Sequence, residues 1–395
     1  MSAPLTGAIA LLLAPGAAAS AYLATLAGLA LLPKRKPATQ AHGPATRFAV
    51  VVPAHNEEAL LPRLLESLSA QDYPADRFSV HVIADNCSDA TAETGRSHGA
   101  AVHERREPDR PGKGQAIAWL LPLLAGPETE AYAFVDADST IDANFLAAMS
   151  SRLGRGERAL QASYRVADPE SAPLVTLRAI AFALMHELRG RGKARLGVSC
   201  GIWGNGIVLA REVVERTSWQ SFSSVEDAEQ HIRLVLDGVK VTFVPETSVY
   251  GFMPSSLGSA AGQQQRWEAG RLALLRRYWR PLLGAAVSRR NGSAAVLLLE
   301  LAIPPLSVLL IGELGVTALA WLFGSPAAKL LSAAAIGGLA AYISVGLTLS
   351  GLRPRAYLAL AHAPRYVFWK AWLYVRELRR RAEPAWTRTT RDGAA

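Results

Sequence analysis

The sequence predicts an α/β protein in which a doubly wound, mostly parallel sheet is joined to about three transmembrane helices and to amphipathic helices at the membrane interface. Two observations support this prediction. Short apolar runs alternate with helical periodicity between 47 and 258, and long uncharged runs lie on both sides of that segment. Half of the 395 residues are hydrophobic and 19% are charged, whereas about a quarter are charged in soluble domains. This composition excludes a disordered chain, and two cysteines are too few for a disulfide scaffold.

The first apolar run, residues 4–32, contains no charged residue and is longer than the roughly 20 residues that span a bilayer. Lys34, Arg35 and Lys36 follow it directly. A signal peptide would carry its charges before a shorter apolar run, so we interpret the segment as a retained transmembrane helix. The positive-inside rule then places its C-terminal end in the cytoplasm and the N-terminus outside. Residues 33–46, rich in Pro, Ala and Thr, are predicted to be a linker.

Two later apolar runs, 294–323 and 330–351, predict a helical hairpin in the membrane. Pro304 and Pro305 interrupt the first run, which also contains Glu300 and Glu313. Carboxylates at membrane depth are costly and often functional. We nevertheless expect both acids to face the helix bundle or to lie near the interfaces, because the motifs that indicate chemistry lie elsewhere.

Strands and helices alternate between the membrane segments in the order of a doubly wound sheet. The expected strands are 48–52, 78–83, 101–103, 131–135 and 207–210. The expected helices are 56–70 with Asn56 as N-cap, 88–98 with Ser88 or Asp89 as N-cap, and 113–125. Ligands of such sheets bind outside the carboxyl ends of the strands. Because the polar clusters 53–57, 85–89 and 136–138 each follow a strand, we expect them to line one crevice.

Asp136 and Asp138 directly follow the apolar strand that ends at Val135. Two carboxylates one residue apart can both face a crevice when the backbone turns there. Carboxylate oxygens suit Mg²⁺ or Mn²⁺, and the oxygens of a diphosphate would complete the coordination. The pair therefore predicts a site for a divalent cation and a diphosphate.

Glu226 and Asp227 lie at the start of a predicted helix that Ser223 or Ser224 would cap. One interpretation is that the two acids only compensate the positive end of the helix dipole. The other interpretation is that one of them acts as a general base. The local pattern slightly favours the first.

Two glycine-containing loops accompany these acids. Lys113 stands between Gly112 and Gly114, which allow close approach of the backbone to a phosphate, although the spacing is not that of a P-loop. Residues 201–206 (GIWGNG) predict a tight loop before the strand at 207–210. Cys87 and Cys200 both fall in the segment expected to be cytoplasmic, so no disulfide is predicted.

Gln263, Arg266 and Trp267 begin a basic and apolar helix over 259–290. One interpretation is an interfacial helix whose arginine side chains reach toward water. The other places the Trp267 ring against the apolar face of a sugar, with Arg266 and Gln263 binding anionic or hydroxyl groups. The two interpretations are compatible, because one face of the helix can rest on lipid and the other on the site.

The C-terminal segment 352–395 contains ten basic and three acidic residues, a net charge of +7 out of +9 for the whole chain. Within it, 364–381 mixes aromatic side chains with Arg and Lys, which is typical of a helix lying in the membrane interface. An amphipathic helix packed on the α/β domain is the alternative. The basic residues concentrate beside membrane segments, so they indicate contact with anionic lipid rather than with nucleic acid.

The ordered set of motifs resembles that of membrane-bound family 2 glycosyltransferases. The matching segments are VVPAHNEE, ADNCSDAT, GKGQA, DAD, VED and QQQRW, and the resemblance covers about 48–280 together with the flanking membrane pattern. It is similar to the catalytic cores of cellulose, chitin and hyaluronan synthases and of ceramide glucosyltransferases. The resemblance implies a GT-A fold and inverting transfer of a sugar from a UDP-sugar, with Mg²⁺ or Mn²⁺ as cofactor.

The resemblance also implies a role for each matching residue. Pro53 and Glu57 would flank the nucleoside, Asp85 would contact the base, and Lys113 would lie near the base or the phosphates. Asp136 and Asp138 would hold the metal and the diphosphate. Asp227, next to Glu226, would deprotonate the acceptor hydroxyl. The acceptor and the diphosphate would be bound by residues from two segments, Cys200, Gly201, Gln263, Arg266 and Trp267.

We therefore predict an integral protein of the cytoplasmic membrane whose catalytic domain faces the cytoplasm. It would transfer the sugar to a lipid-linked or polysaccharide acceptor in exopolysaccharide or glycolipid synthesis, with other polysaccharide-export subunits as candidate partners. The alternative hypothesis is a non-catalytic nucleotide-sugar-binding or scaffold subunit of a membrane polysaccharide complex. The intact candidate acids argue against that alternative.

Overall fold

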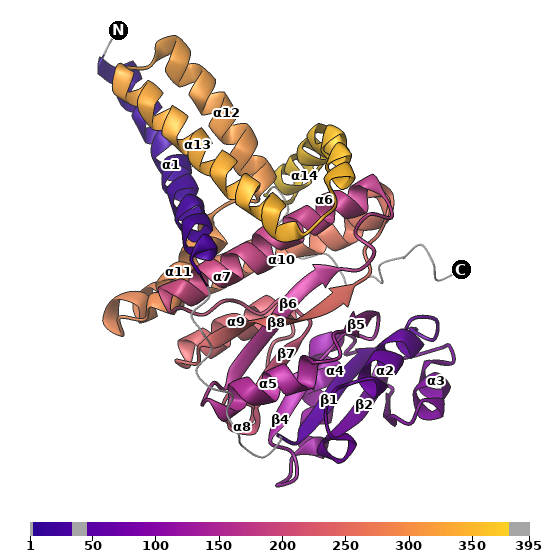
Figure 1. Cartoon of the computed structure of the whole chain (residues 1–395). Coiled ribbons are helices and arrows are strands. Elements are labelled where there is room, and N and C mark those ends of the chain that lie inside the picture. Colours follow the sequence, from indigo (N-terminus) through magenta and orange to yellow (C-terminus); the bar gives the residue numbers. More distant parts are fainter. Residues whose placement is uncertain (1–2, 34–45, 379–395) are drawn as a thin grey trace.

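The computed structural model describes residues 3–33 and 46–378 (Figure 1). An α/β domain built around one sheet lies on one side, a bundle of long helices lies on the other, and α6, α7, α10 and α11 lie between them. The basic cluster at 34–36, most of the predicted linker 33–46 and the tail from 379 onward lie outside the described residues.

In the part of the chain that the structure describes, the sheet has eight strands in the order β3-β2-β1-β4-β7-β6-β8-β5. Strands β3, β2, β1 and β4 are parallel, β7 is antiparallel to both of its neighbours, and β6 is parallel to β8. The predicted parallel arrangement thus holds for the first four strands, and the other half of the sheet is mixed. The strands are β1 Phe48–Ala54, β2 Phe78–Asp85, β3 Ala101–Arg105, β4 Ala131–Phe134, β5 Ser139–Ile141, β6 Ala159–Val166, β7 Ile207–Ala210 and β8 Val241–Gly251.

The central strand β1 shows why the carboxyl ends of these strands form one edge. Residues 48–52 are all buried, as expected of a parallel strand that is covered on both faces. Phe48 is paired with Phe78 of β2 on one side and with Ala131 of β4 on the other. Because the three strands start in register and run in the same direction, the residues that follow them emerge at the same edge.

Helices of the α/β domain cover the sheet and connect its strands. In α2 the buried leucines recur with helical spacing, at 61, 64, 65 and 68. A π-helical turn, Ala183–Leu188, joins α6 to α7, and 3₁₀ turns occupy Ala75–Arg77 and Leu121–Leu124. The helices are α2 Leu61–Ser69, α3 Thr91–Ser97, α4 Lys113–Leu120, α5 Phe145–Gly154, α6 Pro173–Phe182, α7 Arg189–Leu196, α8 Arg211–Thr217 and α9 Glu226–Leu236.

The predicted N-caps are wrong, for local reasons. Asn56 has a φ of 56°, which turns the chain away from a helix, and α2 begins only after the cap residue Leu60. Helix α3 is preceded by Ala90, although Asp89 still accepts a hydrogen bond from the Thr91 amide at 3.0 Å. Helix α9 follows Val225 rather than a serine, but both Glu226 and Asp227 lie in its first turn as predicted.

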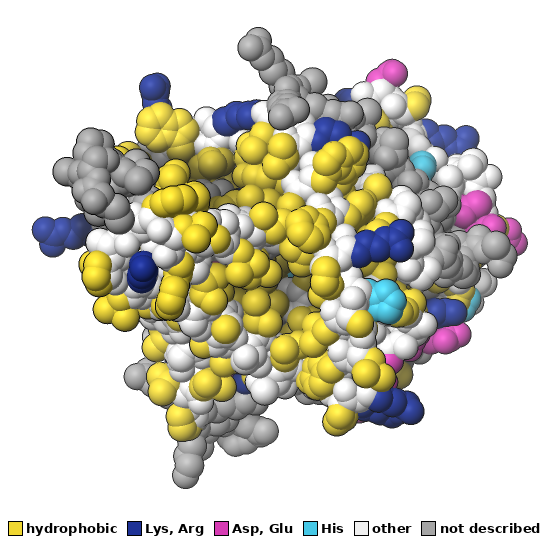
Figure 2. Space-filling view, turned by 90° about the horizontal axis from the view of Figure 1, so that it is seen from above, with side chains coloured by type: hydrophobic (Ala, Val, Ile, Leu, Met, Phe, Trp, Pro, Cys, Tyr) yellow, Lys and Arg dark blue, Asp and Glu magenta, His cyan; other side chains and the backbone are white. Residues whose placement is uncertain are grey.

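Three helices are long and apolar enough to cross a membrane, over Leu11–Leu31 of α1 (Ala3–Leu31), α12 (Leu306–Phe323) and α13 (Pro326–Ser350). They pack against one another, and hydrophobic side chains gather on the face of the molecule above them (Figure 2). Exposed side chains on these helices include Leu11, Trp321, Leu322 and Leu330. Such an apolar surface is unfavourable in water and suits a bilayer.

The predicted segment 294–323 is divided in the structure into α11 (Gly292–Ala302) and α12. Pro304 and Pro305 lie between the two helices, because a proline provides no amide hydrogen and disfavours a helical preceding residue. Helix α11 packs along α10 (Leu257–Ser288), so the membrane-spanning helix of this region begins at Leu306.

Helix α14 (Ala363–Leu378) corresponds to the predicted interface segment 364–381 and follows the 3₁₀ turns Pro354–His362. It rests on α10, where Arg376 donates to Gln265 Oε1 at 3.1 Å and Lys370 Nζ lies 3.8 Å from Glu268 Oε1. Phe368 remains 65% exposed on its outer side. The helix therefore combines packing on the protein with an outward aromatic surface.

The two acids expected to face the helix bundle or to lie near the interfaces both contact other helices of the protein. Glu300 accepts from Tyr22 of α1 at 3.1 Å and from Lys193 of α7 at 2.7 Å, at the junction of the α/β domain and the bundle. Glu313 is 3% exposed and faces Gly16 of α1.

Candidate active site

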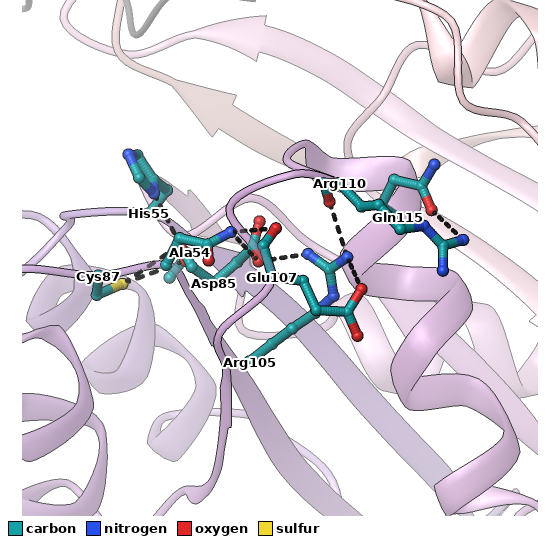
Figure 3. A network of polar contacts seen from close by, with 9 residues as sticks. Ala54, His55, Asp85, Cys87, Arg105, Glu107, Arg110 and Gln115 are labelled. Atoms are coloured by element: carbon teal, nitrogen blue, oxygen red, sulfur yellow. Dashed lines mark hydrogen bonds and ion pairs between the residues drawn. The ribbon is translucent and has the colours of Figure 1, made fainter.

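The carboxyl edge of β2 and β3 carries a buried ion pair. Arg105, the last residue of β3, donates to Asp85 Oδ1 at 2.6 Å and to Glu107 Oε2 at 2.8 Å (Figure 3). The guanidinium is also held by the Arg110 carbonyl at 2.7 Å. Asp85 was predicted from the sequence, whereas Arg105 was missed because the strand was expected to end at 103. The pair fixes the Asp85 carboxylate at the site edge.

The segment after β1 lies beside this pair. His55 Nδ1 is 2.7 Å from the Asp85 carbonyl oxygen, and the Glu57 amide donates to Thr91 Oγ1 at 2.8 Å. The left-handed Asn56 between them directs the chain across the strand ends. Pro53, Glu57 and Asp85 thus lie in neighbouring segments at one edge of the sheet.

Lys113 connects three segments that are far apart in the sequence. Its ammonium donates to Asp136 Oδ1 and to the Gly204 carbonyl oxygen, and it lies 4.0 Å from Glu226 Oε1. The helix start carries Lys113 into this position because Gly114 lies against the chain before α9. A Cβ atom at Gly114 would stand 2.1 Å from the Ser221 carbonyl oxygen. Lys113 therefore lies beside the acids Asp136 and Glu226.

The loop between Cys200 and β7 holds the acids in place. Asn205 is fully buried; its Oδ1 accepts from the Asp136 amide at 3.1 Å, and its Nδ2 donates to Ser139 Oγ at 2.7 Å. Gly204, with a φ of 81°, lies so close to Asp227 that a Cβ atom would stand 3.1 Å from Oδ2. Sequence reasoning identified the tight loop but not these two contacts, which depend on pairing between distant segments.

Burial changes the electrostatics of the acid pair on α9. Burial, reinforced by the neighbouring charge of Asp227, raises the pKa of Glu226 to about 7. Burial likewise raises the pKa of Asp227, although hydrogen bonding to the Ala228 amide and the charge of Lys113 oppose the change. Burial disfavours the charge on Lys113, but Asp136 and Glu226 outweigh it and hold its pKa above the usual value. A carboxylate with a raised pKa is a stronger base.

The candidate donor groups for a divalent cation are the two carboxylates predicted from the sequence, those of Asp136 and Asp138. Asp136 shares one oxygen with Lys113, and Asp138 is 8% exposed with Ser139 Oγ 3.5 Å from its Oδ1. The described residues contain no group of three or more His, Cys, Asp or Glu side chains placed to hold a metal. Two carboxylates fit Mg²⁺ or Mn²⁺ if a diphosphate supplies further oxygens, which is how Mg²⁺ is usually bound.

Helix α10 presents Gln263, Arg266 and Trp267 along the other side of the site. The charge of Arg266 interacts with that of Glu226, which opposes the lowering of the Arg266 pKa by burial. Gln263 Oε1 accepts from Arg178 of α6, and the Arg178 guanidinium lies 5.7 Å from the centre of the Trp267 ring. Arg178 was missed in the sequence, because a lone arginine in an apolar helical segment carries no motif.

Cys200 lies in the hydrophobic core, where its side chain is fully buried and burial raises the pKa of the thiol to about 12. Gly201 beside it has a φ of 127° and lies against Trp203. The Trp203 ring stacks on His186 at 4.6 Å, and His186 stacks on Tyr164 at 5.4 Å. Three stacked rings therefore lie beside this loop, and the thiol is buried in the core.

Comparison with known proteins places this arrangement in a family. Residues 44–270, more than half of the chain, match the family described as glycosyltransferase-like family 2. The chain belongs to this family.

Curated proteins with similar sequences carry names of the same kind. The probable glycosyltransferase YdaM of Bacillus subtilis is 25% identical over 57% of this chain and 55% of its own length. A beta-monoglucosyldiacylglycerol synthase of Trichormus variabilis is 25% identical over 62% of this chain and 53% of its own length. A glucomannan 4-beta-mannosyltransferase of Cyamopsis tetragonoloba is 22% identical over 59% of this chain and 47% of its own length. The chain matches about half the length of these curated relatives.

A solved structure shows the same fold. A mannosyltransferase from Pyrobaculum calidifontis, in complex with GDP-Man and Mn²⁺, superposes with a TM-score of 0.61 over 94% of this chain and 99% of the other. The two sequences are 19% identical, so the likeness concerns the GT-A fold.

Proposed function

We propose that this glycosyltransferase transfers a sugar, with inversion, from a UDP-sugar to a lipid-linked or polysaccharide acceptor at the cytoplasmic face of a membrane. The observation that carries the proposal is the convergence of Lys113, Asp136, Glu226 and Asp227 at the carboxyl edge of the sheet, with Arg266 of α10 opposite Glu226. The three apolar helices support the membrane location.

In the proposed reaction Asp227 accepts the proton of the acceptor hydroxyl as that oxygen bonds to the anomeric carbon. The carbon–oxygen bond to the nucleoside diphosphate breaks, and the diphosphate leaves with the bonding electrons. Attack from the face opposite the diphosphate inverts the anomeric centre. Burial favours this role because it raises the pKa of Asp227 and so strengthens the base.

The remaining residues bind and orient. Asp85, held by Arg105, would contact the base, with Pro53 and Glu57 flanking the nucleoside. Arg266 and Gln263 would bind the departing diphosphate, and Trp267 the acceptor sugar. Asp136 and Asp138 would hold Mg²⁺ or Mn²⁺, which would neutralise charge on the diphosphate. The Mn²⁺ in the mannosyltransferase of the same fold supports this cofactor.

The expected orientation puts the α/β domain in the cytoplasm and the N-terminus outside. The basic residues of the C-terminal segment support it, because anionic lipid of the cytoplasmic leaflet attracts such charges. A direct check is to label single cysteines introduced at each end of the chain with a reagent that does not cross the membrane.

The decisive experiment is turnover by the purified full chain in detergent. UDP-sugars and, because the neighbour of similar fold binds GDP-Man, GDP-sugars are offered with Mg²⁺ or Mn²⁺. Sugar-dependent release of the nucleoside diphosphate and its loss on adding EDTA are expected. We expect Asp227→Asn to lower turnover by about 10²–10⁴-fold. Wild-type rates in that variant would refute the base assignment, and binding without turnover of any donor would favour the non-catalytic alternative.

A further inference from the structure

Arg178 of α6 is a buried cation without a carboxylate counter-charge. It is 4% exposed, and among the described residues no Asp or Glu oxygen lies within 4 Å of its guanidinium. Other buried cations have such a partner: Arg105 has Asp85 at 2.6 Å, and Lys193 has Glu300 at 2.7 Å. Desolvating an unpaired charge is costly, so a retained buried arginine calls for an anion.

The hydrogen bonds of Arg178 leave room for that anion. Nη2 donates to Gln263 Oε1, while Nη1 is buried and has no hydrogen-bond partner among the described residues. A planar guanidinium binds a phosphate through two parallel N–H groups. The Trp267 ring centre lies 5.7 Å from the guanidinium carbon, and Tyr366 of α14 interacts electrostatically with the guanidinium. Because Nη1 is buried, an anion would reach it only by displacing a side chain that covers it.

Helix α6, which carries Arg178, lies beside the end of a membrane-spanning helix. Helix α6 packs against Pro354–His362, the segment that directly follows the membrane-spanning α13. The π-helical turn after α6 touches the same span, where the Leu184 carbonyl accepts from Tyr342 at 3.0 Å. Arg178 therefore lies at the level where the span ends, which is the level of lipid head groups.

The same residue is within electrostatic reach of the reaction centre. The charges of Arg178, Asp136 and Asp227 all act on the Tyr164 hydroxyl. Gln263, which accepts from Arg178, is one turn from Arg266 on α10. An anion at Arg178 would thus sit beside the acceptor end of the site and on its membrane side.

We propose that Arg178 binds the phosphate group of a lipid acceptor, so that the acceptor is a lipid phosphate rather than a neutral lipid or a polysaccharide. That the bound lipid phosphate is the sugar acceptor rests on the proposed function. Its binding to Arg178 can be tested without turnover. The other source of a phosphate, the diphosphate of the donor, is assigned to Arg266 and to the metal site.

The test measures binding of two probes to the full chain in neutral detergent by native mass spectrometry. The probes are a long-chain isoprenyl phosphate and the corresponding isoprenol. We expect the wild type to bind the phosphate at least about tenfold more tightly, because hydrogen bonds to charged groups are worth that much. Arg178→Gln should abolish the preference. Arg355→Gln, which removes an exposed cation near the same membrane side, should keep it.

Three outcomes overturn the proposal. The first is a wild type without preference for the phosphate, which needs no variant and so is independent of folding. The second is an unchanged preference in Arg178→Gln with an unchanged melting temperature. The third is weaker UDP binding by Arg178→Gln with unchanged lipid-phosphate binding, which would assign the residue to the donor. Binding through Arg178 without sugar transfer to any acceptor would instead refute the proposed function alone.

Discussion

Replacement of Lys113 by methionine tests the electrostatic design of the site most directly. The ammonium is the cation that contacts Asp136 and lies 4.0 Å from Glu226 Oε1. Methionine has a similar length and volume and removes only the charge and the hydrogen bonds. Without that charge, the buried acids Glu226 and Asp227 should hold their protons to higher pH.

The size of the effect follows from Coulomb's law. Two unit charges 4.0 Å apart interact by about 1 kcal/mol in water and by about 4 kcal/mol at an effective dielectric constant of about 20, which is about one to three pH units. The Lys113 side chain is 23% exposed and that of Glu226 17% exposed, so solvent screens the pair in part. We therefore expect a shift in the lower half of this range, about one to two pH units.

The assay is the pH dependence of kcat for release of the nucleoside diphosphate. Activity falls on the acid side as the base Asp227 is protonated. The charge of Lys113 also opposes the rise of the Asp227 pKa, so this limb should move to higher pH in Lys113→Met. The measured quantity is the pH at the midpoint of this limb. The maximal kcat is not compared, because a change in donor binding also alters it. Lys113→Arg should restore the wild-type limb. Lys370→Met removes a cation that pairs with Glu268 on the far side of α10 and serves as the matched control. An acid limb at the wild-type position in Lys113→Met would refute the reasoning.

Three further predictions concern the same edge of the sheet. Gly204→Ala places a methyl group 3.1 Å from Asp227 Oδ2 at a residue with a φ of 81°. We expect kcat to fall about tenfold or more, while the free energy of unfolding drops by only about 1–2 kcal/mol. A kcat equal to that of the wild type would contradict the close approach. Arg105→Met leaves Asp85 buried without its partner and should lower stability by about 3–5 kcal/mol, with partial recovery in the double variant with Asp85→Asn, as measured by thermal unfolding in detergent. The pKa of Glu226 is raised from 4.5 to about 7 on folding, so its contribution to stability is present below pH 4.5 and is lost as the pH rises toward 7. The stability of Glu226→Gln should lack this loss. If the melting temperature of the variant depends on pH as that of the wild type does, the prediction is contradicted.

The sequence was informative wherever one segment alone determines the structure. The apolar run 48–52 and the acids after 135 predicted a strand and a site edge, because burial on both faces requires continuous hydrophobic residues. Position in the first turn of α9 was likewise predictable for Glu226 and Asp227. The caps were predicted wrongly, because the Asn56 side chain accepts from the Ser88 amide of another segment rather than from an amide of its own helix.

What the sequence could not show depends on distant segments meeting. Arg105, Asn205 and Arg178 carry no local motif, and each acquires its role through a residue at least 20 positions away. The break of 294–323 has a different cause. The two prolines were visible in the sequence, but only the packing of α11 along α10 decides that the helix leaves the bundle there.

Helix α10 separates the two substrates that the proposed reaction brings together. One side of the helix carries Arg266, whose charge interacts with Glu226 in the α/β domain. Another side carries Gln265 and Glu268, which bind α14 at the membrane side. A nucleotide sugar is water-soluble and must enter at the strand ends, whereas a lipid acceptor can enter only from the bilayer. Because α10 contacts both regions and bears the motif residues between them, the α10–α14 contact would lie on the acceptor side of the proposed site. We therefore expect substitutions at the α10–α14 contact, such as Gln265→Ala, to raise the KM for the acceptor and to leave the KM for the donor unchanged; a change in the donor KM alone would contradict this division.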